Sequence, residues 1–447
     1  MTDQNPSDVV RARGARLGPL NASFNARYPG EAPGRQPVHT VYGGGHLFKS
    51  DTAARMGAVA RRALADFAPD AAALNGVLGL GAIAPAVYSR ITEKLAREPV
   101  EDFRIDFEDG YGNRPDADED AHVAAAAREV AAGLKAGSLP PFIGIRIKPL
   151  NEELRSRSLR TLHIFLSTLV DAAGRLPPQF IVTLPKITVP EQVSAFADVL
   201  GLLERELGLA AGALRFEVMI ETPQVVLADD GRSPLPLLLD AAGGRLSAAH
   251  FGTYDYTAGL GITAAHQRMR HPACDFAKHM MQVAFAGTGI WLSDGSTSVL
   301  PVPLHRAAEG STLTARQSGE NRDSVHAAWR LHYDDIRHSL AGGFYQGWDL
   351  HPAQLVTRYA ALFAFFIEGL DAAGERLTNF VTKAAQASLV GDVFDDAATG
   401  QGLLNYFLRG INSGAVTEEE AVARSGLTVD EIRGRSFVRI LKARGKG

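Results

Sequence analysis

Short apolar runs recur along the chain, and longer segments with apolar residues at helical spacing separate them. The short runs are typical of buried β-strands and lie at residues 39–42, 103–107, 142–147, 180–185, 215–220, 247–252, 289–293 and 344–350. The helical patterns lie at residues 51–68, 84–97, 116–136, 151–173, 190–207, 271–287 and 324–341. This alternation predicts an α/β protein with a parallel sheet.

Eight strands with helices between them fit a (β/α)8 TIM barrel, whose active site lies at the carboxyl ends of the strands. A doubly wound open sheet is the alternative. We find no G-x-G-x-x-G segment that opens a helix, so dinucleotide binding has no support from the sequence.

The two ends of the chain depart from the barrel pattern. Residues 1–35 are rich in Gly, Pro and Arg, and we expect a loosely structured arm that wraps the body. The barrel is predicted to span 36–355, and a helical C-terminal extension 356–447. Helical patterns of the extension lie near 353–372, 376–389 and 400–411, and two capping boxes begin at Thr417 and Thr428.

Composition and charge narrow the class of protein. Hydrophobic residues make up 46% of the 447, which is sufficient for a large core. The formal charge of −4 argues against a nucleic-acid binder. The one cysteine, Cys274, excludes an internal disulfide framework. No run approaches the roughly 20 apolar residues of a membrane span, and no signal-peptide pattern is found. We therefore expect a soluble, cytoplasmic protein without nucleic-acid or membrane partners.

Charged residues stand at the ends of several apolar runs. Glu221 closes one run and Asp255 follows the next, and both acids are expected to be exposed at the barrel mouth. The other strand-end charges are Glu108, Asp109, Arg146, Lys148 and Lys186. Because the carboxyl ends of parallel strands meet on one face of a barrel, these groups are predicted to form a site.

The two acids have the chemistry of a magnesium site. Mg²⁺ prefers one or two carboxylates together with water and substrate oxygens, which Glu221 and Asp255 would supply. Arg146 offers a planar fork for a substrate carboxylate or phosphate. The cation would polarise the carbonyl of a bound 2-oxo acid and so stabilise an enolate. A structural interpretation stays open, in which Glu221 caps a helix and Asp255 holds a turn.

Two further features are candidates for substrate binding. Gly44 and Gly45 follow the first strand in a glycine-rich loop, whose amides could hold a phosphate. A plain flexible turn is the alternative for that loop. His351 follows the last strand and is predicted either to contact substrate or to hold the strand end through a hydrogen bond.

Six segments, in order, resemble motifs of the citrate lyase β-subunit and malyl-CoA lyase superfamily of Mg²⁺-dependent carbon–carbon lyases. They are Asp106-Phe-Glu-Asp109 (D-L-E-D), Ile145-Arg-Ile-Lys148 (R-V-N), Leu184-Pro-Lys186 (L-P-K), Met219-Ile-Glu-Thr222 (I-E-T), Phe251-Gly-Thr-Tyr-Asp255 (F-G-x-x-D), and the run from Gly343 to Gln354 (G-F-x-G-K-x-x-I-H-P-x-Q). The resemblance implies Glu221 and Asp255 as Mg²⁺ ligands and Arg146 as the carboxylate anchor. It also implies a catalytic group of Arg146, Glu108, Asp109 and Lys186.

Departures from the family pattern set the limits of this prediction. Lys148 replaces an Asn and is predicted to add a positive charge beside the substrate anchor, whereas Trp348 stands where Lys is usual. The chain is also longer than the family core, so it resembles a divergent, enlarged member.

The predicted function is a Mg²⁺-dependent lyase or aldolase that acts through a metal-stabilised enolate on a 2-oxo acid or acyl-CoA-type substrate. We expect the protein to be a homo-oligomer. Thioester hydrolysis at the same metal site and a non-catalytic metabolite-binding barrel are the alternatives.

Overall fold

A computed structural model describes residues 13–30, 32, 34–382, 388–390, 393–395, 397–434 and 436–444. Eight parallel strands pair in chain order, and β8 closes on β1 to form a barrel. The strands are β1 (His39–Gly44), β2 (Asp102–Asp106), β3 (Phe142–Arg146), β4 (Phe180–Leu184), β5 (Arg215–Ile220), β6 (Leu246–Phe251), β7 (Trp291–Ser296) and β8 (Gln346–Asp349). The predicted (β/α)8 class is therefore confirmed.

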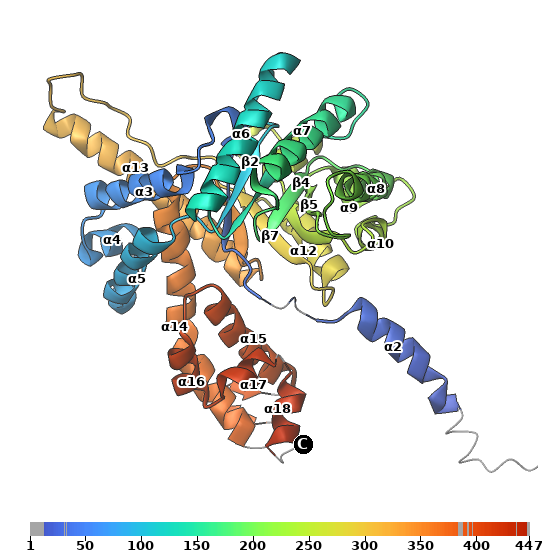
Figure 1. Cartoon of the computed structure of the whole chain (residues 1–447). Coiled ribbons are helices and arrows are strands. Elements are labelled where there is room, and N and C mark those ends of the chain that lie inside the picture. Colours follow the sequence, from blue (N-terminus) through green and yellow to red (C-terminus); the bar gives the residue numbers. More distant parts are fainter. Residues whose placement is uncertain are drawn as a thin grey trace, which may run out of the picture.

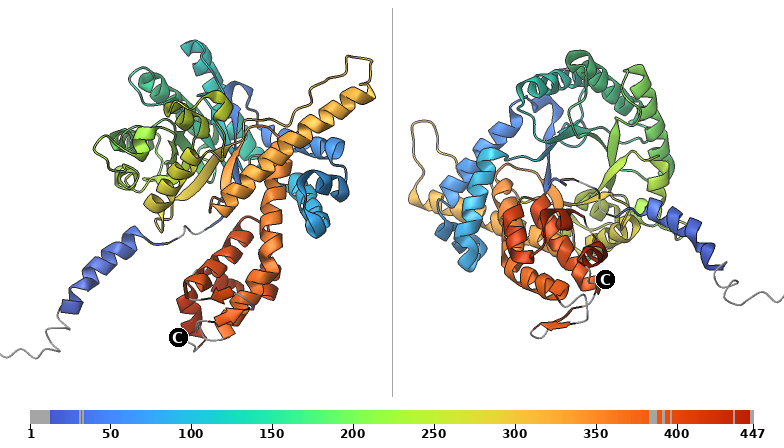
Figure 2. Two further views of the ribbon diagram at one scale, coloured as in Figure 1. Left: turned by 180° about the vertical axis from the view of Figure 1, so that it is seen from behind. Right: turned by 60° about the horizontal axis from the view of Figure 1, so that its bottom comes forward.

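Helices surround the barrel as an outer ring, which is clearest in the right-hand view of Figure 2. They are α3 (Thr52–Phe67), α4 (Ala71–Leu78), α5 (Ala84–Arg97), α6 (Asp116–Ala136), α7 (Arg155–Ala173), α8 (Pro190–Glu206), α9 (Pro223–Val226), α10 (Leu237–Ala241), α11 (Thr253–Gly259), α12 (Pro272–Phe285) and α13 (Ala315–Ala341). The predictions missed α4 and the short helices α9, α10 and α11, and they placed the start of α13 too late. A capping box between Thr314 and Gln317 starts α13 nine residues earlier than the apolar pattern does.

The barrel interior is polar rather than filled by branched aliphatic side chains. Arg104 on β2 donates hydrogen bonds to Thr183 on β4 and Glu217 on β5. Neither β4 nor β5 is a neighbour of β2, so the contacts cross the barrel interior. The residues on either side of Arg104 in β2, Phe103 and Ile105, belong to the hydrophobic core, as expected when successive side chains face opposite sides of a strand.

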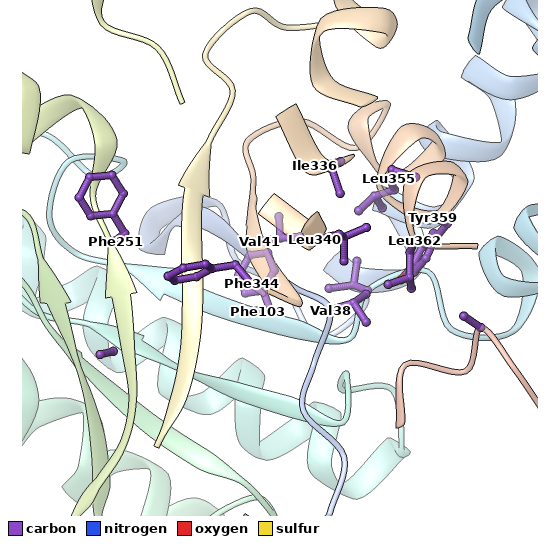
Figure 3. Close-up of a cluster of buried hydrophobic side chains, with 14 of the residues drawn as sticks. Val38, Val41, Phe103, Phe251, Ile336, Leu340, Phe344, Leu355, Tyr359 and Leu362 are labelled. Carbon is purple, nitrogen blue, oxygen red and sulfur yellow. The ribbon is translucent and has the colours of Figure 1, made fainter. Parts of the chain in front are cut away.

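The hydrophobic core joins the barrel to α13 and to α14 (Gln354–Thr382). In Figure 3, Val38 and Val41 lie close to Leu340 of α13 and Leu362 of α14. All residues from 354 to 364 are buried, so the first half of α14 packs as the last helix of the barrel. Its second half carries the C-terminal extension (Figure 1). The helix runs without interruption across the predicted barrel limit at residue 355.

The extension contains α15 (Ala397–Asn412), α16 (Glu418–Ser425), α17 (Val429–Arg433) and α18 (Phe437–Ala443). Both predicted capping boxes, at Thr417 and Thr428, are present. The helix predicted for 376–389 is wrong at its end. There, β9 (Ser388–Val390) pairs antiparallel with β10 (Val393–Asp395). The β-branched and aromatic residues of these two segments favour strands. No helix within the described ranges is long and apolar enough to cross a bilayer.

The N-terminal arm differs from its prediction. Residues 17–27 form helix α2 (Leu17–Arg27), which projects away from the barrel in both Figure 1 and Figure 2. Every residue from 13 to 29 is exposed. Two contacts anchor the base of the arm. The Gly30 N–H donates to the Gly287 carbonyl over 2.8 Å, and Arg27 forms an ion pair with Asp240. The expectation of a loose arm that wraps the body is therefore wrong for these residues, while residues 1–12 lie outside the described part.

Candidate functional site

A cavity of about 380 Å³ opens at the carboxyl ends of the strands. Its lining brings together five of the predicted site residues, which are Gly44, Asp109, Arg146, Glu221 and Asp255. These residues come from loops and strands around most of the barrel. Their convergence follows from barrel closure, which brings distant strand ends to one face.

Glu221 follows β5 directly and is only 2% exposed. The prediction that this acid is exposed at the mouth is therefore wrong. Its Oε1 accepts the Lys186 N–H at 2.8 Å. Asp255 is more open, with 42% of its side chain exposed, and lies in the first turn of α11 rather than at a strand end.

The buried Glu221 carboxylate forms no ion pair with a described residue, although Lys186 and Arg146 are near enough to act on its charge. Among the described residues, no side-chain nitrogen of Lys, Arg or His lies within 4.0 Å of a Glu221 carboxylate oxygen, which is the limit for an ion pair. Burial, and next the charge of Asp255, raise the pKa of Glu221 to about 8. Because a bound divalent cation would offset both effects, the Glu221 and Asp255 pair fits a metal ion.

The two carboxylates form a donor set that suits magnesium. Across the described ranges, no three or more His, Cys, Asp or Glu side chains are grouped to hold a metal. Mg²⁺ needs only one or two carboxylates and takes its other oxygens from water and substrate. Zinc sites use three or four protein ligands. Glu221 and Asp255 are therefore sufficient for Mg²⁺.

Gly252, directly after β6, leaves room for the Glu221 side chain. A Cβ at this position would lie 2.5 Å from the Glu221 Cβ and closer still to its carboxylate. Gly252→Ala should therefore displace Glu221 and weaken Mg²⁺ binding by at least about tenfold, a loss of roughly 1.4 kcal/mol. Isothermal titration calorimetry with Mg²⁺ measures this change.

The matched control is Gly319→Ala on α13, where a Cβ would meet nothing within 4 Å. It should leave Mg²⁺ affinity unchanged. Equal affinities for Gly252→Ala and the wild type would show that Glu221 does not need the space at Gly252.

Lys186 occupies a strained backbone position among the acids. Its φ is +49°, in the left-handed region that residues other than glycine rarely adopt. Its Nζ forms an ion pair with Glu108 and lies 3.2 Å from both Asp109 and Asp255. Burial alone would lower the pKa of Lys186, but Glu108 and Glu221 outweigh it and raise the pKa. Lys186 is thus a fixed positive charge rather than a proton acceptor.

The carboxylates of Asp106 and Glu108 hold the guanidinium of Arg146 in place. Its Nε and Nη2 donate to the two oxygens of Asp106 over 2.7 and 2.5 Å, and its Nη1 lies 3.0 Å from Glu108 Oε2. The guanidinium also lies 4.7 Å from the ring centre of Tyr42 and 5.8 Å from that of Trp348. This setting fixes the fork at the cavity wall.

Asp106 holds other residues of the cavity in place, and the sequence interpretation left it without a role. Besides holding Arg146, its carboxylate accepts the Glu108 and Gly110 amides at 2.9 and 2.7 Å. It therefore orients both the anchor and the acidic loop after β2. The signal was its place two residues after Arg104 in β2, because alternate residues of a strand face the same side.

Five predicted residues do not line the cavity. Glu108 and Lys186 still contact its lining, through Arg146 and through Asp109 and Asp255. The other three make their contacts elsewhere. Lys148 is buried, and its Nζ donates to the Phe107 carbonyl and to Glu119 over 2.6 and 2.7 Å. It thus ties β2 to α6 instead of lying beside the anchor as expected. His351 accepts the Ala353 N–H at 3.2 Å, which agrees with its structural interpretation. The third residue, Gly45, packs against the Phe107 ring and lies outside the lining, unlike Gly44.

Trp348 connects the cavity to the polar barrel interior. Its Nε1 donates to His250 Nδ1 over 3.2 Å, and His250 Nε2 faces Glu217 at 3.1 Å. Sequence reasoning noted Trp348 only as a departure from a family pattern and missed its neighbour Tyr42, whose ring centre is 4.5 Å away.

Several solved structures are similar to this chain. A citrate lyase from Burkholderia xenovorans LB400 matches with a TM-score of 0.55 and 18% identity over 88% of this chain and 97% of that one. A magnesium/glyoxylate complex of Haloferax volcanii malate synthase gives 0.46 and 16% over 89% and 97%. CitE from Mycobacterium tuberculosis, with magnesium, acetoacetate and coenzyme A, gives 0.46 and 14% over 88% and 98%.

The predicted resemblance to the citrate lyase superfamily is thus confirmed as a likeness of fold. No curated protein matches this chain significantly. One family model, described as a domain of unknown function, matches residues 17–440 and so covers both the barrel and most of the extension. The chain belongs to this family, DUF6986.

Proposed function

We propose that this protein is a Mg²⁺-dependent carbon–carbon lyase or aldolase that acts on a 2-oxo acid or on an acyl-CoA-type thioester. One observation carries the proposal. The buried carboxylate of Glu221 lies beside Asp255, without an ion-pair partner among the described residues, in a cavity that Arg146 also lines. A metal site and an anion anchor in one cavity are the two requirements for chelating such a substrate.

Glu221 and Asp255 would hold the cation, which when bound polarises a carbonyl oxygen and favours negative charge on it. Arg146 would orient a substrate carboxylate, because Asp106 fixes the plane of its guanidinium. Lys186 would balance the charge of Glu108 and Asp109 near the reacting atoms.

Asp109 is the acid most open to a bound molecule. It lines the cavity, and 60% of its side chain is exposed. Although burial opposes its ionisation, Arg146 and Lys186 outweigh that effect and lower the pKa of Asp109. It would therefore accept hydrogen bonds from water or substrate as a carboxylate at neutral pH.

Removal of one proposed ligand gives the direct test of the metal site. Asp255→Ala should weaken Mg²⁺ binding strongly in calorimetry, since the cation would keep only one of its two proposed protein carboxylates. The fold should be retained because Asp255 is partly exposed. The control is Asp229→Ala, which removes an exposed acid outside the cavity. Wild-type affinity in Asp255→Ala would refute the metal assignment.

A substrate screen with Mg²⁺ separates the proposed lyase from the other two functions. The wild type is first tested for thermal shifts with 2-oxo acids and acyl-CoA thioesters, and then for turnover. Carbon–carbon cleavage products support the lyase. Free thiol released from an otherwise intact acyl group indicates a hydrolase, and thermal shifts without any turnover indicate a metabolite-binding protein.

A further inference from the structure

Helix α2 presents an apolar stripe that none of the described residues covers. Leu17, Leu20 and Phe24 follow one another at i, i+3 and i+7, so they lie on one side of the helix. They are 55%, 65% and 62% exposed. An isolated helix of this length is marginal in water, and burial of an apolar stripe is what usually stabilises one. The stripe therefore requires a partner surface.

The outer face of α12 carries a second stripe with the same spacing. Phe276, His279 and Val283 also lie at i, i+3 and i+7, and Phe276 and Val283 are 52% and 79% exposed. The partly buried Met280 lies beside them and packs against the core. Each stripe spans about 10 Å along its helix, so the two are matched in length.

The arm leaves the body at the end of its own α12. The Gly30 N–H donates to the Gly287 carbonyl. If Gly287 carried a Cβ, that atom would lie 3.9 Å from a ring carbon of Tyr28. From there α2 leads away from the barrel, as both Figure 1 and Figure 2 show. Within one chain, the stripe on α2 (here the donor stripe) and the stripe on α12 (the receiving stripe) therefore start from the same side of the molecule but do not meet.

The charges of the arm and of the body favour a second copy of this protein as the partner. Residues 13–30 contain Arg13, Arg16 and Arg27 and no acid, whereas the whole chain has a formal charge of −4. The remainder of the chain is thus the acidic part. Asp275 adjoins the receiving stripe, and Arg27 already pairs with Asp240 at 2.7 Å near the base of the arm. A basic arm is attracted to such a body in a second copy.

We propose that α2 of one copy packs on α12 of a second copy, with Leu17, Leu20 and Phe24 against Phe276 and Val283. Because each copy has both an arm and a receiving face on one side, the exchange can be reciprocal and close. The family match begins at residue 17, so the arm helix lies inside the matched region.

Cross-linking between two differently substituted chains tests the contact. Phe24→Cys and Val283→Cys are made as separate full-length proteins, mixed and treated with a short bismaleimide. The native Cys274 is buried, so it does not compete. We expect a product with the mass of two chains in the mixture and much less with either protein alone. Absence of this product would overturn the proposal.

Molar mass in solution gives the second test. We expect the wild type to self-associate in light scattering, and Leu20→Asp/Phe24→Asp to raise the dissociation constant at least about 100-fold. The matched control is Leu304→Asp, which changes a 66% exposed leucine between β7 and α13. It should leave the association unchanged.

Three outcomes would overturn the proposal here. The first is a wild type with the mass of a single chain. The second is an association that the arm substitutions leave intact. The third is a monomer that binds vesicles of phosphatidylcholine and phosphatidylserine through the arm, because a basic apolar helix also suits an anionic membrane surface.

Discussion

At pH 9, without divalent metal, the Glu221→Gln variant is expected to be more stable than the wild type by about 4 kcal/mol. In the folded protein, burial and Asp255 raise the pKa of Glu221 from its ordinary 4.5 to about 8. Between these values the folded state keeps a proton that the unfolded state has lost. The free energy of unfolding of the wild type therefore falls as pH rises through this window.

Glutamine removes this dependence because it does not ionise. Its side-chain oxygen can still accept the Lys186 N–H that Glu221 accepts at 2.8 Å. Urea unfolding in a chelating buffer, at steps from pH 5 to pH 9, measures the difference between the two proteins. The difference should be small at pH 5 and grow towards pH 9.

Magnesium should reverse the order of stability at high pH. A ligand that binds only the folded state stabilises it, and we expect Mg²⁺ to do so for the wild type but not for Glu221→Gln. Glu153→Gln, which changes an exposed acid before α7, is the control. Parallel pH profiles for the wild type and Glu221→Gln would show that Glu221 ionises as an ordinary acid.

Arg104→Met is expected to lower the free energy of unfolding by about 3–5 kcal/mol. Arg104 is 1% exposed inside the barrel, forms an ion pair with Asp102, and donates to both oxygens of Glu217 over 2.9 and 2.8 Å. Methionine fills a similar space but leaves two carboxylates buried without their main counter-charge. That desolvation cost, rather than lost packing, sets the size of the effect.

Urea unfolding at pH 7 measures this loss, with Arg62→Met as the matched control. The Arg62 side chain is 85% exposed and lies 3.5 Å from Asp66, so its removal should cost at most about 0.5 kcal/mol. Arg104→Lys keeps the charge but loses the fork, and should lie between the wild type and methionine. Equal changes at positions 62 and 104 would contradict a stabilising interior network.

The fold was predictable because periodicity is a local property. The apolar runs at 103–107, 142–147 and 180–185 each became a strand, and the amphipathic segments between them became helices. Closure of the barrel followed from the number of strands and their order. The capping boxes at Thr417 and Thr428 were likewise found where the sequence placed them.

The environment of each strand-end charge was less predictable. Lys148 and Arg146 are two residues apart, yet Lys148 pairs with Glu119 outside the cavity while Arg146 lines it. Spacing along one strand does not say where a long side chain finds its counter-charge once the strand has ended. The burial of Glu221 was missed for a similar reason, since Gly252 and Lys186 enclose it from two other strands.

The sequence alone determined the barrel and the set of strand-end charges that converge in one cavity, because both depend on periodic patterns and on chain order. Only the tertiary structure decided which charges meet, that Asp106 holds Arg146, that the interior is built around Arg104, and that α2 stands apart from the body. Contacts across a barrel join residues far apart in the chain, and their burial sets the pKa values and charge balance that no local pattern encodes.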